Sequence, residues 1–114
     1  MANLNMQGPF PFNSESINKN ITKSSPGNYA LGTANDQGLL SIKYIGRADK
    51  DVNERLHDWI GVKNHPQFKF SYAKSAKDAY LKECQNWHDF KPTENSIHPD
   101  KPDGTDWKCP TCDT

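Results

Sequence analysis

Residues 27–46 decide the fold that the sequence predicts, and they read GNYALGTANDQGLLSIKYIG. Apolar and polar residues alternate over residues 29–33, and residues 39–45 are rich in residue types that favour strands. Between these runs lies a polar turn at residues 34–38 that ends in glycine. Two short strands separated by such a turn indicate a β-hairpin. Gly46 permits a sharp exit from the second strand.

A helix, a strand and a second helix are expected after the hairpin. Asp51 can cap a helix whose apolar residues recur at helical spacing, and Gly61 can end it. Residues 67–73 alternate between aromatic and polar side chains, which indicates a half-buried strand. Ser75 can cap a second helix that runs to about residue 90. The predicted order β-β-α-β-α specifies an α/β (α+β) fold with a small three-stranded sheet.

The chain divides into three parts. Residues 1–26 are rich in Asn, Ser and Lys and are expected to form a polar N-terminal arm with at most one short helical turn. Residues 27–90 hold the predicted hairpin and helices and form the core. Residues 91–114 form a tail in which repeated prolines forbid long regular elements.

Composition limits the class of protein. A chain of 114 residues, of which 33% are hydrophobic and 25% charged, can bury one modest core. Its net charge is zero, whereas nucleic-acid binders usually carry a basic surplus, so any nucleic-acid site must be a local basic patch. Three cysteines do not suggest a closed disulfide framework, and neither a signal peptide nor a membrane-spanning run is present. A reducing, cytoplasmic setting without membrane contact is expected.

One carboxylate lies where apolar residues are expected. Glu83 falls on the apolar stripe of the second helix, beside Tyr80 and Trp87. A carboxylate buried there must be paired, protonated or metal-bound, because burying it bare is costly. A salt bridge to Arg55 or Lys43 is the structural alternative to a functional role, and the sequence alone leaves both open.

The order of these features resembles the GIY-YIG nuclease family. A Gly-Asn-Tyr motif at residues 27–29 and a Tyr-Ile-Gly motif at residues 44–46 precede Arg55 in the first helix and Glu83 in the second. The resemblance covers roughly residues 27–90. It implies hydrolysis of phosphodiester bonds in DNA, with RNA as an alternative, assisted by one catalytic Mg²⁺ or Mn²⁺ ion.

The resemblance also implies a role for each matched residue. Glu83 would hold the catalytic Mg²⁺, and Arg55 would stabilise the charge that builds on the phosphate. Tyr29 would help to activate the attacking water, and Tyr44 would orient the site. Because a phenol with a pKa near ~10 is a poor base, Tyr29 needs a neighbouring charge or must act by orienting water.

The chain departs from the family pattern at several positions. Asn28 replaces the isoleucine of the first motif, and Trp59 stands where many members carry a histidine. The auxiliary candidates are Arg47, His57 and Asn95, with Asn86 as an alternative to Asn95.

A second set of residues has metal-ligand spacing. Cys84 and His88 are four residues apart and so lie on one face of a helix. Cys109 and Cys112 form a Cys-x-x-Cys knuckle, and the four together make a Cys₃His set that suits a structural Zn²⁺. His98 is the alternative fourth ligand. Cys84 could instead be a small buried hydrophobe, and the Cys-x-x-Cys motif a redox pair.

Three functions are consistent with these features. The first is a divalent-metal-dependent endonuclease acting on nucleic acid, with DNA favoured. The second is a non-catalytic, zinc-stabilised module that binds nucleic acid or protein. The third is an antibacterial nuclease toxin, whose partner would be an inhibitor protein. The oligomeric state is not encoded in any pattern that we recognise.

Overall fold

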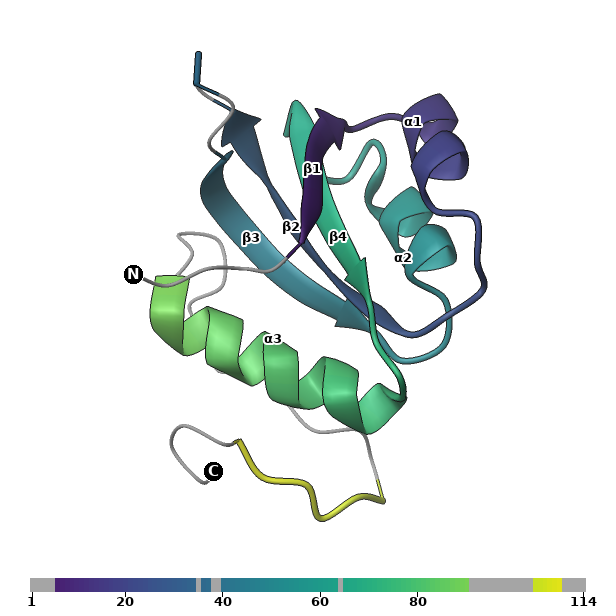
Figure 1. The fold of residues 1–114 in the computed structure, drawn as a ribbon, viewed down its shortest axis with the longest axis vertical. Helices are drawn as coiled ribbons and strands as arrows, with labels where there is room; N and C mark the ends of the chain where they lie inside the picture. Colours follow the sequence, from purple (N-terminus) through teal and green to yellow (C-terminus); the bar gives the residue numbers. More distant parts are fainter. Residues whose placement is uncertain (1–5, 35, 38–39, 64, 91–103, 110–114) are drawn as a thin grey trace.

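The structure is a computed structural model that describes residues 6–34, 36–37, 40–63, 65–90 and 104–109. In this part of the chain, four strands form one antiparallel sheet with helices on both faces (Figure 1). The strand order is β1-β4-β2-β3. The elements in chain order are β1 (Gln7–Pro11), α1 (Ser14–Asn20), β2 (Gly27–Ala34), β3 (Leu40–Ala48), α2 (Val52–Trp59), β4 (Gln67–Tyr72) and α3 (Ala76–Phe90).

The prediction of a three-stranded sheet was wrong, because β1 adds a fourth strand at the edge formed by β4. Gln7 lies opposite Phe70 and Pro11 opposite Gln67, with an irregular register between these pairs. The strand was missed because it is only five residues long and contains prolines, which are tolerated at the edge of a sheet but argue against a strand in sequence.

The segment assigned to a polar arm also contains α1. Asn13 caps this helix, since its side chain accepts a hydrogen bond of 2.7 Å from the Ser16 amide. Ile17 and Ile21 are buried in the main hydrophobic core. The seven-residue helix therefore belongs to the folded unit, and its two isoleucines hold it there.

Strand β2 is one of the two inner strands of the sheet and pairs with β4 and β3. Alternation along it separates two faces. Tyr29 and Leu31 face the core shared with α1 and α2, whereas Ala30 faces the apolar cluster that includes Phe90 of α3. Figure 1 shows the consequence: α1 and α2 lie on one side of the sheet and α3 on the other.

Both predicted helix caps are confirmed. The Asp51 side chain accepts a hydrogen bond of 3.0 Å from the Asn53 amide, and Ser75 Oγ accepts one of 3.1 Å from the Asp78 amide. Gly61 follows α2 with a φ of 83°, a conformation that favours glycine. These caps fix where α2 and α3 begin, and so which side chains of each helix reach the edge of the sheet.

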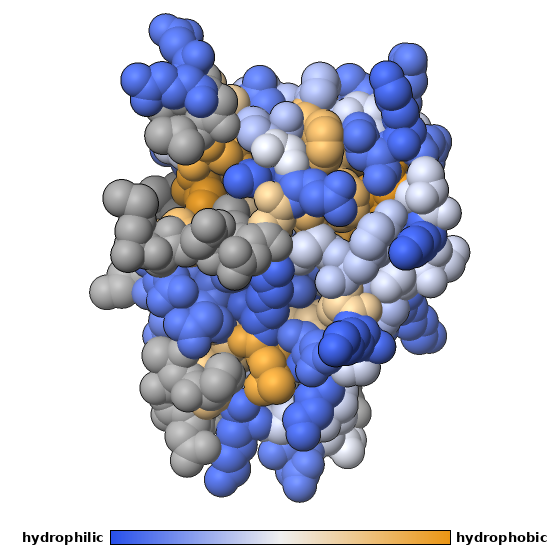
Figure 2. Space-filling model, viewed as in Figure 1, coloured by the Kyte–Doolittle hydropathy of each residue, from blue (hydrophilic) through white to orange (hydrophobic). Residues whose placement is uncertain are grey.

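One face of the molecule is mostly polar (Figure 2). Figure 2 shows a largely hydrophilic face with small apolar patches. Among the described residues, no helix is both long and apolar enough to cross a membrane.

Candidate functional site

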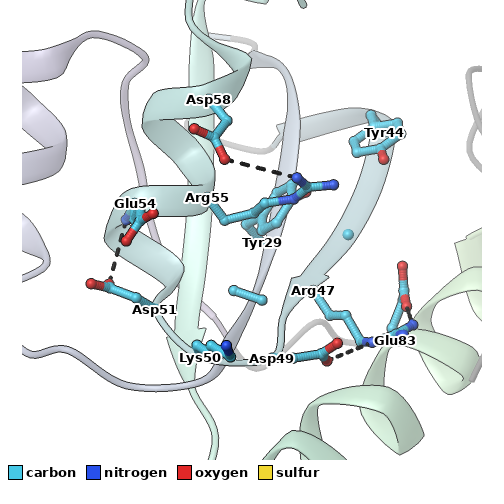
Figure 3. A pocket seen from close by; sticks show the side chains of 12 residues that line it. Tyr29, Tyr44, Arg47, Asp49, Lys50, Asp51, Glu54, Arg55, Asp58 and Glu83 are labelled. Atoms are coloured by element: carbon cyan, nitrogen blue, oxygen red, sulfur yellow. Dashed lines mark hydrogen bonds and ion pairs between the residues drawn. The ribbon is translucent and has the colours of Figure 1, made fainter. Parts of the chain in front are cut away.

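An open cavity of about 670 Å³ lies beside the edge strand β3, between α2 and α3 (Figure 3). The four residues that the family resemblance selected all line it, and each comes from a different element. Tyr29 lies on β2, Tyr44 on β3, Arg55 on α2 and Glu83 on α3. The fold therefore brings together side chains that are as many as 54 positions apart in the sequence.

Tyr29 is held on three sides. Its hydroxyl accepts a hydrogen bond of 2.6 Å from the indole nitrogen of Trp59. Its ring stacks on Tyr44, with centroids 6.2 Å apart and planes inclined by 30°. Gly46 lies directly opposite it in the strand register, and the phenol packs against the face where a side chain would stand. Gly46 is therefore needed to let the phenol cross β3. The sharp exit from the sheet expected at Gly46 was wrong, because β3 continues to Ala48.

The Tyr29 hydroxyl is a neutral phenol at physiological pH. Burial is the main cause that raises its pKa well above the ordinary value of 10.0, and the neighbouring Tyr44 adds to the effect. The hydrogen bond from Trp59 and the charge of Arg55 act in the opposite direction but are weaker. A phenol in this state can orient a water molecule by hydrogen bonding, whereas removing a proton from that water is unfavourable.

Glu83 is buried, with 8% of its surface exposed, and it forms an ion pair with Arg47. The Arg47 Nη1 atom donates to Glu83 Oε1 over 2.5 Å, and Arg47 Nε donates to Asp49 Oδ1 over 2.9 Å. Arg47, rather than the Arg55 or Lys43 expected as structural partners, makes this pair. Burial works against the charged guanidinium, but Glu83 and Asp49 together outweigh it and raise the pKa of Arg47.

Arg55 approaches the cavity from α2. Its guanidinium lies 4.9 Å from the centroid of the Trp59 ring and 3.8 Å from a carboxylate oxygen of Asp58. The side chain is 46% exposed, so this ion pair is weak. In Figure 3 the Arg55 side chain reaches from α2 toward Tyr29 and β3. An arginine held this loosely can turn its fork of donors toward an incoming phosphate.

Carboxylates outnumber cations around the cavity. Five acidic residues line it, against three basic ones. A lining with this balance attracts a divalent cation and repels a bare phosphate. The acidic residues are Asp49, Asp51, Glu54, Asp58 and Glu83, and the basic ones are Arg47, Lys50 and Arg55.

The donor set fits a hard divalent cation. Glu83 and Asp49 hold the guanidinium of Arg47 between them, so their oxygens already converge on one positive group. Carboxylate oxygens are the protein ligands that Mg²⁺ prefers, and Mg²⁺ usually needs only one or two of them because it keeps several waters.

Two of the predicted zinc ligands lie together on the other side of α3. Cys84 and Cys109 are both buried in one cluster with Tyr80, and Trp107 packs against Tyr80 with ring centroids 6.1 Å apart. Burial is the main cause that raises the pKa of the Cys84 thiol to about 12, and the contact with Cys109 contributes. Trp107 and Cys109 therefore pack on α3.

The remaining zinc candidates are not gathered in the described part of the chain. His88 is half-buried one turn after Cys84, and its ring lies 5.0 Å from that of Trp87. Cys112 and His98 lie outside the described residues. Among those described, no group of three or more potential ligands comes together.

His57, an auxiliary candidate, lies away from the cavity. One ring nitrogen is 2.8 Å from the Asn53 carbonyl oxygen and the other 3.1 Å from Ser14 Oγ, so the ring bridges α2 and α1. The helix turns His57 toward α1, and it does not line the cavity.

Asn28 and Asn86 are both buried, and the one contact described for them ties two elements of the fold together. Asn28, the departure from the family motif, is fully buried and donates a hydrogen bond of 2.8 Å to the Ala79 carbonyl, which ties β2 to α3. Asn86 is buried on α3 and does not line the cavity, and Asn95 lies outside the described residues. In the sequence, the signal for this contact was a single polar residue, Asn28, next to a short stretch of strand-forming residues.

Asp49 is the site residue that sequence reasoning missed. It follows β3 and pairs with Arg47 two positions earlier. The only available signal was the short Arg-x-Asp spacing just after the second motif, which is common on protein surfaces.

Comparisons of the chain with protein-family models, with curated proteins and with solved structures found no match.

The contact between Gly46 and Tyr29 can be tested by substitution. In Gly46→Ala the new methyl would overlap the phenol, with Tyr29 Cε2 only 2.7 Å away. We expect the free energy of unfolding to fall by about 1–3 kcal/mol, the usual cost of overpacking. Urea denaturation followed by circular dichroism measures this change. In a Tyr29→Leu background the same substitution should cost less than half as much, and an undiminished cost would contradict the contact.

Proposed function

We propose that this protein is a divalent-metal-dependent endonuclease that hydrolyses phosphodiester bonds, with DNA as the favoured substrate. The observation that carries the proposal is the meeting of Tyr29, Tyr44, Arg55 and Glu83 at one cavity. These are the residues that the resemblance to the GIY-YIG family selects from the sequence alone. A buried carboxylate, two stacked phenols and an arginine thus line the same cavity.

The residues divide the work in the proposed reaction. Glu83 would hold the Mg²⁺ or Mn²⁺ ion, which when bound neutralises charge on the scissile phosphate and the leaving oxygen. Arg55 would turn its fork of donors to the phosphate oxygens as negative charge grows there. Tyr29 would orient the attacking water through its neutral hydroxyl, and Tyr44 would hold the Tyr29 ring by stacking.

The charge balance supports a particular kind of substrate binding. A neutral chain with an acidic cavity cannot make the many phosphate contacts of a tight nucleic-acid binder. We expect weak binding in the absence of divalent cation, with the metal supplying the charge that brings a phosphate into the cavity.

A specific observation favours a second candidate, the non-catalytic binding module. Glu83 is paired with Arg47, and Trp59 both replaces the family histidine and occupies the Tyr29 hydroxyl. In a protein of this fold without catalytic activity, the ion pair and the hydrogen bond to Tyr29 would only stabilise the folded state. No described residue bears on the antibacterial toxin, its inhibitor protein or the cytoplasmic setting, so these stay predictions.

Cleavage of supercoiled plasmid DNA with Mg²⁺ or Mn²⁺ tests the nuclease directly. We expect the wild-type protein to nick the plasmid and Glu83→Gln to lose roughly a hundredfold or more in rate, because the metal loses its carboxylate. Asp89→Asn is the matched control, since it removes an exposed carboxylate from the same helix. Stem-loops and RNA should be offered in the same assay.

Two outcomes would reject the nuclease. One is the absence of cleavage of every substrate by a folded wild-type protein, which would favour the binding module. The other is cleavage that survives in Glu83→Gln at the wild-type rate, which would point to a contaminating enzyme.

We also propose that Cys84, His88, Cys109 and Cys112 hold a structural Zn²⁺, with His98 as the alternative to His88. The contact between the buried Cys84 and Cys109 thiols supports this, because it brings together two of the proposed ligands that are 25 positions apart in the sequence. A bound ion would fix the tail against α3, the helix that carries Glu83.

Zinc content measured by mass spectrometry tests the proposed zinc site. We expect one zinc ion per chain in protein purified without chelator, and its loss in Cys84→Ser and in Cys109→Ser, since each variant removes a thiolate ligand. Comparison of His88→Ala with His98→Ala then identifies the fourth ligand. Wild-type protein that is fully folded and free of zinc would refute the proposal.

A further inference from the structure

We propose that Arg47 exchanges partners during the reaction: it pairs with Glu83 in the metal-free protein, and it binds the substrate phosphate once a divalent cation has taken Glu83. This inference rests on the proposed nuclease function and adds to it a competing counter-ion and a second phosphate ligand. It assigns to Arg47 a role distinct from that of Arg55.

The ion pair occupies the carboxylate that the metal needs. The Arg47 and Glu83 side chains are 14% and 11% exposed, and the atoms that join them are 2.5 Å apart. A carboxylate so nearly removed from water requires a positive partner. A guanidinium and a divalent cation can each supply that charge, but the bonded Oε1 atom cannot serve both at full strength. Cation binding and the Arg47–Glu83 pair are therefore expected to compete.

Arg47 has partners that remain when it leaves Glu83. Its Nε atom donates to Asp49 over 2.9 Å, and the guanidinium carbon lies 5.2 Å from the centroid of the Tyr80 ring. Asp49 is 40% exposed at the edge of the cavity, whereas Tyr80 is buried beneath it. Because Nε and Nη1 are different donors, the side chain can release Glu83 and still keep its bond to Asp49. The cost of displacement is therefore smaller than for a pair with no other contact.

The released donors would face the cavity. Arg47 enters it from β3, and Arg55 enters from α2 (Figure 3). Tyr29 lies in the same cavity between those two elements. Two arginines that approach from separate elements can hold a phosphate by two forks of donors, which fixes its orientation as well as its charge. Without a cation the cavity is too acidic for this, so metal binding would precede phosphate binding.

A Mn²⁺ titration tests the exchange. The concentration of free Mn²⁺ is read from its electron paramagnetic resonance signal in wild type, Arg47→Gln and Glu83→Gln. We expect Arg47→Gln to bind Mn²⁺ about tenfold more tightly than wild type, because the competitor is gone, and Glu83→Gln to bind it more weakly. At saturating Mn²⁺ we expect Arg47→Gln to cleave plasmid roughly a hundredfold more slowly, because the phosphate has lost a fork of donors.

The opposite results overturn the exchange. Unchanged or weaker Mn²⁺ binding by Arg47→Gln means that the ion pair is only structural. Tighter Mn²⁺ binding with undiminished cleavage means that Arg47 does not bind the substrate phosphate. Arg47→Met removes the charge but keeps most of the apolar length of the side chain, and it is the variant to use if Arg47→Gln does not fold. It too should bind Mn²⁺ more tightly than wild type, and no rise contradicts competition. A wild type that binds Mn²⁺ through Glu83 but cuts nothing rejects the nuclease alone, since the affinity arm still tests the competition.

Discussion

The pairing of β2 with β3 places Tyr29 opposite Gly46, and the rest of the site depends on this register. A shift by one residue would turn Tyr29 to the α3 face and put a side chain where its ring now packs. In the observed register the same strand sends Tyr29 toward α2 and Asn28 toward α3. The two helices that frame the cavity are thus positioned by neighbouring residues of one strand. Backbone pairing, rather than any single side-chain contact, determines that a phenol and a carboxylate from opposite faces meet at the sheet edge.

Electrostatics then decide what this geometry can do. Three basic side chains against five carboxylates leave the cavity lining with a formal charge of −2, in a chain whose total is zero. One divalent cation would cancel that charge, and only then would the arginines be free to attract a phosphate. The Arg47–Glu83 pair is the part of the lining that is already neutralised. A site of this kind would have to bind the metal ion before it could bind the substrate phosphate.

Local signals predicted the parts of the fold that are governed by local interactions. The hairpin, both helix caps and the half-buried strand β4 follow from alternation and capping residues, and they stand where they were expected. Strand β1 escaped prediction because its pairing with β4 joins residues about 60 positions apart and leaves no periodic pattern in a five-residue, proline-containing segment. The four candidate site residues could be chosen because the order of motifs along a chain is visible in the sequence alone. The partner of Glu83 could not, since Arg47 reaches α3 only through the path that β3 takes along the sheet edge.

The proposed nuclease needs a divalent cation bound at Glu83, within the cavity that Tyr29 lines. Paramagnetic line broadening by substoichiometric Mn²⁺, measured on backbone amide resonances, locates the bound ion without any assay of activity. We expect selective broadening at the β3 end of the cavity and the middle of α3, including Gly46, Arg47 and Glu83, while α1 stays sharp. Uniform weak broadening, or broadening centred on another part of the chain, would show that no cation binds at Glu83.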